Sequence, residues 1–96
     1  MKILFTQRAA NAYASIKKYI EEEWGEKTAA GFEQKTIDFL DLLIEYPEIG
    51  IIEVPDIQIR AFQLTRHTRV FYRIKREQII ILTLFDSRQD PQKKPK

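Results

Sequence analysis

The residues best suited to chemistry in this sequence are arginines in its second half, and a histidine and a phenylalanine lie among them. Guanidinium groups can bind phosphates and stabilise the charge that develops when a ribose 2′-hydroxyl attacks a phosphodiester. They can equally bind an acidic protein partner. The set therefore indicates a surface for something negatively charged, and it leaves open whether that surface binds or cleaves. Its members are Arg60, Arg66, His67, Arg69, Phe71, Arg73 and Arg88.

Other kinds of chemistry find little support in the residue types. The chain has one histidine and no cysteine, so we expect neither a metal site nor a cofactor. The three glycines stand apart at positions 25, 31 and 50, which excludes a phosphate-binding loop. A nucleophilic triad would need His67 with Ser15 or Ser87, and neither serine lies in a strained nucleophile turn. For Tyr72 the sequence favours a packed aromatic over a catalytic role.

Charge is distributed unevenly along the chain. Residues 1–56 contain 6 Lys or Arg and 11 Asp or Glu, a net charge of −5, whereas residues 57–96 contain 10 and 3, a net charge of +7. The two sum to the +2 of the whole chain. This division predicts a basic surface on the C-terminal half, suited to nucleic acid or to an acidic protein. The alternative is that these side chains only keep a sheet edge soluble.

The first elements that would position the arginines are a strand and two helices. Residues 2–5 predict a short strand. Thr6 is a suitable N-cap for a helix with an apolar stripe that reaches Trp24, and Gly25 occupies its C-cap. A second helical pattern follows until Pro47 ends it. Because the junction at Gly25 is so short, we expect the two helices to form an antiparallel hairpin.

After the second helix the apolar pattern changes to that of strands. We predict strands over Ile57 to Thr65, Arg69 to Lys75 and Gln78 to Asp86. The last is apolar on both faces, as is typical of a central strand. The apolar stretch from Ile49 to Val54 is interpreted as a candidate docking patch for another chain.

Together these elements predict an α+β fold, with an N-terminal strand and an antiparallel helical hairpin packed on one face of a mainly antiparallel four-stranded sheet. The opposite face would then carry Arg69, Phe71 and Arg73. We expect a single domain over residues 1–96, with 87–96 as a flexible polar tail. No segment resembles a signal peptide or is apolar enough to span a membrane, so the expected location is the cytoplasm.

The order of short motifs along nearly the whole chain resembles the RelE/ParE superfamily of toxins. The resemblance implies a growth-inhibiting toxin of a type II toxin–antitoxin system, of the kind that stabilises plasmids, held in a hetero-oligomer by a cognate antitoxin. It also implies a helical hairpin on a four-stranded sheet, as the residue patterns do. The motifs are Tyr19-Ile20 with Trp24-Gly25, Tyr46-Pro47-Glu48-Ile49-Gly50, Ile59-Arg60, His67 with Val70-Phe71-Tyr72-Arg73, and Ile79 to Leu84 followed by Arg88-Gln89-Asp90-Pro91.

The superfamily divides by target, and the resemblance bears on this division too. RelE-like members cut mRNA on the ribosome without a metal, and Arg69 and Arg88 fall on two of their arginines. Paired lysines of that branch are replaced here by the stretch Ile59 to Gln63, and no tyrosine follows Tyr72 to stack on a base. An mRNA endonuclease is therefore the alternative interpretation, in which Arg69 and Arg88 are catalytic.

The favoured interpretation is a ParE-like toxin that poisons DNA gyrase by binding. It rests on Trp24-Gly25 and on His67 with Phe71-Tyr72-Arg73, which are more similar to that branch. In this case the arginines would be contact residues for the target or the antitoxin, with Arg60, Arg66, His67, Phe71 and Arg73 as the predicted binding set. A third interpretation is a member that keeps only the ability to bind an antitoxin.

Overall fold

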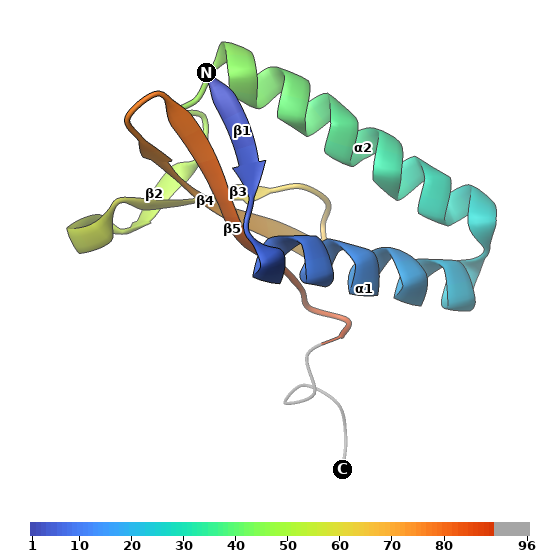
Figure 1. Cartoon of the computed structure of the whole chain (residues 1–96). Coiled ribbons are helices and arrows are strands. Elements are labelled where there is room, and N and C mark those ends of the chain that lie inside the picture. The colour runs from blue at the N-terminus through green and yellow to red at the C-terminus, as the bar shows by residue number, and fades with distance from the viewer. Residues whose placement is uncertain (90–96) are drawn as a thin grey trace.

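The computed structural model describes residues 1–89 and has the predicted α+β architecture (Figure 1). Of the polar segment 87–96 that we expected to be flexible, residues 90–96 lie outside the described part. At the start of that segment, Ser87 is attached to the fold, because its backbone N donates a hydrogen bond to His67 O over 2.9 Å. No helix within residues 1–89 could cross a membrane. The elements are β1 Lys2–Phe5, α1 Gln7–Trp24, α2 Glu26–Glu45, β2 Ile51–Val54, the 3-10 turn Pro55–Ile57, β3 Ile59–Gln63, β4 Thr68–Lys75 and β5 Gln78–Asp86.

The sheet has five strands in the order β1-β5-β4-β3-β2, and this corrects the predicted four. The additional strand is β2, within the segment that we had interpreted as a docking patch. It lies at an edge, where it pairs only with β3, and all four of its residues are exposed. The sheet is also mixed, because β1 runs parallel to β5 while the other neighbours are antiparallel.

Both ends of α1 form as their residues predict. The Thr6 hydroxyl accepts a hydrogen bond from Ala9 N over 3.0 Å and donates one to Leu82 O over 2.9 Å, which ties the start of α1 to β5. Gly25 has φ +94°, a backbone conformation that glycine adopts without a steric cost. It ends α1 by donating to Glu21 O and also precedes α2. The chain therefore reverses through one residue.

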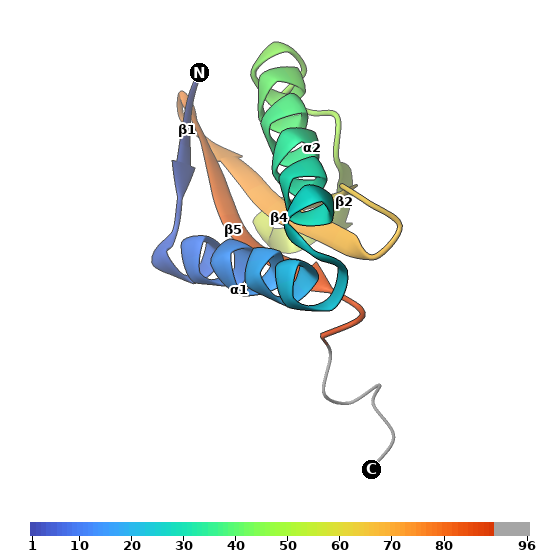
Figure 2. The same cartoon turned by 90° about the vertical axis from the view of Figure 1, so that its right-hand side faces the viewer.

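The helical hairpin covers one face of the sheet, as Figure 2 shows for α2 in front of β4. Phe39 from α2 stacks on Phe62 from β3, with ring centroids 4.5 Å apart. Each large apolar side chain that is fully buried here contributes about 1.5–3 kcal/mol. The core thus joins both helices to the middle of the sheet. Its buried members include Ala9, Ile16, Ile20, Phe32, Phe39, Leu43, Val70, Tyr72, Ile79, Ile81 and Leu84.

Tyr72 is the packed aromatic that the sequence favoured. Its ring is fully buried, and its hydroxyl donates to Pro47 O and accepts from Gly50 N, each over 2.8 Å. Burial raises the pKa of Tyr72, although the Gly50 amide and nearby Arg60 act against the rise. A Cβ on Gly50 would lie 2.8 Å from the tyrosine ring, so only glycine allows this approach. The segment after α2 is thereby fastened to the centre of the sheet.

Tyr72→Phe should lower the free energy of unfolding by about 1–3 kcal/mol, because it leaves the buried Gly50 amide without its acceptor. Urea unfolding followed by circular dichroism measures this loss. Tyr46→Phe is the matched control, since Tyr46 is 57% exposed and its change should leave stability within about 0.5 kcal/mol. Equal stability of the Tyr72 variant and the unmodified chain would contradict the role given to the hydroxyl.

Candidate functional site

The structure divides the predicted arginines between the two faces of the sheet. Arg69, Phe71 and Arg73 alternate with buried residues of β4 and lie on the face that the helices leave open. Arg60 is in register with Tyr72, so it projects toward the helices. Its guanidinium donates to the carbonyl oxygens of Glu48 and Gly50 over 3.1 and 2.8 Å. Arg60 therefore lies away from the open face and holds the segment before β2.

On the open face, positive charge is mixed with apolar side chains. Arg69 forms an ion pair with Glu53 of β2, and its guanidinium carbon lies 5.3 Å from the centroid of the Phe71 ring. The Nε of Arg73 is buried and has no hydrogen-bond partner among the described residues. Ile51 is in register with Ala61, which is in register with Phe71, so it shares this face and is 76% exposed. The surface is thus amphipathic, and less basic than predicted.

Arg88 lies on the other side, where it holds a buried carboxylate at the end of β5. Asp86 is 3% exposed and accepts from the Thr68 hydroxyl over 2.8 Å and from Arg88 Nη2, Nε and backbone N over 2.8, 3.1 and 2.8 Å. The Arg88 guanidinium carbon also lies 4.9 Å from the Trp24 ring centroid and 6.0 Å from that of Tyr19. Arg88 is therefore fixed by contacts on both sides.

Hydrogen bonding sets the charge state of this pair. Burial alone would raise the pKa of Asp86, but the hydrogen bonds from Arg88 and Thr68 outweigh it and lower that pKa. The hydrogen bond to the same carboxylate raises the pKa of Arg88, although its partial burial acts the other way. Both groups thus stay charged at neutral pH.

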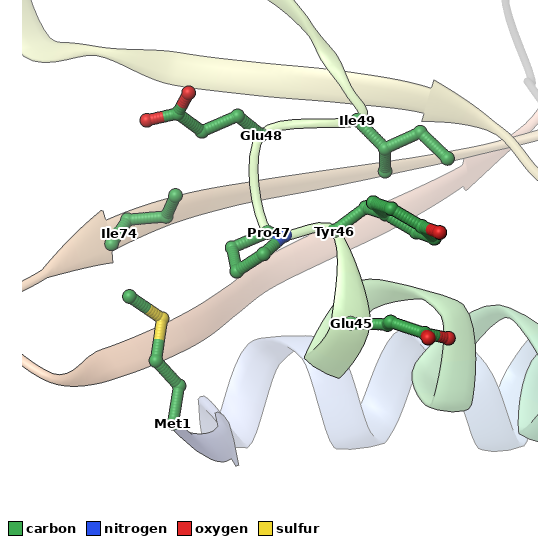
Figure 3. A pocket seen from close by; sticks show the side chains of 7 residues that line it. All are labelled: Met1, Glu45, Tyr46, Pro47, Glu48, Ile49 and Ile74. Carbon is green, nitrogen blue, oxygen red and sulfur yellow. The ribbon is translucent and has the colours of Figure 1, made fainter.

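Two pockets open on the helix side, and only the first borders Arg88. The one beside Arg88 has a volume of about 310 Å³ and is also lined by His67 and Lys35. A larger one of about 670 Å³ lies at the end of α2, where the side chains of Met1, Pro47 and Ile74 face a common space (Figure 3). No predicted site residue lines the larger pocket. Arg66 is exposed on the turn between β3 and β4 and lines neither.

This arrangement suits binding better than phosphodiester cleavage. Arg69 lies on the open face beside Glu53, and Arg88 lies on the helix side beside Asp86. The sheet separates them, so they cannot donate to the same phosphate. No group of three His, Asp or Glu residues within 1–89 is placed to hold a metal ion.

Sequence reasoning missed the carboxylates that partner these two arginines. Asp86 and Arg88 are two residues apart at the end of a predicted strand, and this spacing was a usable signal for a local pair. Glu53 had no comparable signal, because it lies on the unpredicted strand β2. It comes near Arg69 only because β2 pairs with β3 and β3 pairs with β4.

Comparison with known proteins identifies relatives of the chain. The family model described as "ParE toxin of type II toxin-antitoxin system, parDE" matches residues 3–91. The structure is similar to that of the chromosomal ParDE TA system from P. aeruginosa, with 23% identity and a TM-score of 0.74, over 90% of this chain and 95% of that chain. It is also similar to a YoeB/ParE toxin from Agrobacterium tumefaciens, with 16% identity and a TM-score of 0.64, over 90% and 98%. No curated protein matches the chain.

Asp86→Asn should destabilise the protein at pH 7 by about 2 kcal/mol, since it removes charged hydrogen bonds from a buried site. The lowered pKa of Asp86 means that the ionised carboxylate is more favourable in the folded state than in the unfolded chain. Its contribution is therefore complete above the unfolded pKa of about 4 and is lost as pH falls through the folded value.

Urea unfolding of both proteins at pH 7 and pH 3 tests this dependence. The difference between them should shrink at pH 3. Asp41→Asn is the control, because Asp41 is exposed on α2 and its change should cost little at either pH. A penalty for the Asp86 variant that is the same at both pH values would show that its charge is irrelevant to folding.

Proposed function

The chain belongs to the ParE toxin family of type II toxin–antitoxin systems, within the RelE/ParE superfamily, and on this premise we propose that it inhibits growth by binding DNA gyrase. The choice of gyrase is supported by the resemblance of Trp24-Gly25 and of the His67 to Arg73 segment to the ParE branch. It is also supported by the absence, in this sequence, of the lysines and the late tyrosine of the ribonuclease branch.

The observation that carries the proposal is the placement of Arg69 and Arg88 on opposite sides of the sheet. A ribonuclease that used both would need their donors about 3 Å from the oxygens of one phosphate. Here each guanidinium is held by its own carboxylate, Glu53 or Asp86. The geometry therefore favours a toxin that acts through contact over one that cleaves RNA.

The open face is the contact surface that we propose for the target. Arginine and aromatic side chains are enriched in the central contacts of protein–protein interfaces, and this face offers Arg69, Phe71 and Arg73. The exposed Arg66 adds positive charge on the turn that precedes β4. The exposed Ile51 adds an apolar contact at the sheet edge. Such a surface suits an acidic protein patch with apolar side chains in it.

We also propose a cognate antitoxin as the partner that silences the toxin, in a hetero-oligomer. The structure from P. aeruginosa carries the name of a ParDE TA system, which supports a partner of this kind. A cover over the open face would remove the surface proposed to bind the target. Neutralisation would then need no change within the toxin fold.

The purified chain should inhibit supercoiling by gyrase, and the double variant Arg69→Ala, Arg73→Ala should weaken that inhibition. Each central arginine of an interface can contribute about 1–2 kcal/mol, so the loss for both together should be about 30- to 1000-fold. A supercoiling assay over a range of toxin concentrations measures it. Arg8→Ala is the matched control, because Arg8 is an exposed arginine of α1, on the helix side.

Induced expression in cells separates the two targets of the superfamily. A DNA damage response that depends on Arg69 and Arg73 would support gyrase. Arrested translation with cut ribosome-bound messages, lost by about 10²- to 10³-fold in Arg69→Ala or Arg88→Ala, would replace this proposal with an mRNA endonuclease. Purified toxin that leaves supercoiling unchanged at every stoichiometry would also overturn it.

A further inference from the structure

The pocket beside Arg88 brings together two cationic side chains, Arg88 and Lys35, on the helix side and away from the face proposed to contact gyrase. It lies among α2, the turn between β3 and β4, and the residues after β5. We name it the cationic pocket. Its volume is about 310 Å³, and none of the residues that line it is acidic. They are Ile20, Thr28, Gly31, Phe32, Lys35, Thr65, His67 and Arg88.

The polar groups of the cationic pocket are ready to receive an anion. Arg88 uses Nε and Nη2 for Asp86, which leaves Nη1 without a hydrogen bond in the described part of the chain. Lys35 is exposed on α2 and makes no ion pair within residues 1–89. Because Asp86 and Trp24 already hold Arg88 in place, a ligand would order few further rotamers there.

Gly31, which lines this pocket, is a glycine that the fold itself does not require. Glycine is the poorest helix former after proline, yet Gly31 lies in the interior of α2. Its φ is not positive, and a Cβ built on it would meet nothing within 4 Å. Neither the backbone nor internal packing therefore requires glycine at this position. The missing side chain leaves the wall of the cationic pocket open.

We propose that the cationic pocket binds an acidic side chain of a partner protein, an Asp or Glu with an aliphatic neighbour. The carboxylate would lie between Lys35 and Arg88, and the aliphatic group would contact the apolar floor of Ile20 and Phe32. This inference rests on the proposed function, because the cognate antitoxin proposed there is the partner that would supply such a segment. It assigns that partner a contact on the helix side, remote from the open face.

The surroundings favour one carboxylate over the phosphate chain of a nucleic acid. Helix α2 carries two lysines and five acidic residues, a net charge of −3, and α1 ends in the exposed run Glu21 to Glu23. A polyanion laid across these two helices would be repelled by each carboxylate that it passed within a Debye length, about 8–10 Å. A single acidic side chain brings only one negative charge into these surroundings, so it meets less repulsion than a polyanion does.

The test uses the ¹⁵N-labelled full chain and two short peptides, acetyl-Leu-Glu-Leu-amide and its counterpart with Gln in place of Glu. We expect the Glu peptide to shift the amide resonances of Gly31, His67 and Arg88. It should bind at least about tenfold more tightly than the Gln peptide, which is the ratio expected for one charged contact of 1.4 kcal/mol.

Variants of the cationic pocket check where the peptide binds. Gly31→Met should fill the opening and weaken the Glu peptide about tenfold, whereas Gly31→Ala should improve the helix and leave most of the affinity. Lys35→Gln should reduce the preference for Glu over Gln, and Lys27→Gln should leave it unchanged, because Lys27 does not line the pocket. Thermal unfolding of every variant confirms that it is folded.

Equal affinity for the two peptides, or shifts confined to other residues, would overturn the proposal. So would a ten-nucleotide single strand that moves the same amide resonances at lower concentration, since the ligand would then be a nucleic acid. Peptide binding is measured without gyrase, so a negative result here leaves the supercoiling assay untouched. An inactive toxin in that assay equally leaves the peptide result standing.

Discussion

The burial of one side of β4 and β5 against the helical hairpin is the constraint from which the other features follow. Val70 and Tyr72 enter that core, so strand alternation turns Arg69, Phe71 and Arg73 to the opposite side. Two helices joined by a single glycine lie on the same side of the sheet, so they can cover only one of its faces. The other face of the sheet is uncovered because the chain has only these two helices, and it is therefore open to contact with other proteins.

The arginines differ in how firmly the protein holds them. An exposed pair such as Arg69 with Glu53 contributes about 0–1 kcal/mol, so its guanidinium can be redirected toward a partner at little cost. Arg88 is bound to a buried carboxylate and lies against Trp24, so its position is fixed in advance. These two arginines thus do not belong to one uniform basic surface. Arg69 is adaptable on the open face, whereas Arg88 is held rigidly on the helix side.

Sequence reasoning succeeded where local chemistry decides the structure. Thr6 and Gly25 mark the ends of α1 through their own side-chain or backbone properties. In β4, the residue types themselves show which side chains alternate between the two faces. It failed where tertiary pairing decides. β2 has four exposed residues and no alternation of polar and apolar positions, and it is fixed in place through Gly50. Strand register determines which face of the sheet Arg60 lies on, and a shift of one residue in the pairing would place it on the opposite face.

The parallel pairing of β1 with β5 determines how late during synthesis the sheet can be completed. Residues 2–5 are made before their partners, residues 78–81, which follow more than 70 positions later. At about 5–20 residues per second, synthesis takes some seconds to supply them. Until β5 emerges, β4 has no neighbour on that side and β1 has none at all. A translation product that stops before β5 therefore cannot complete this sheet.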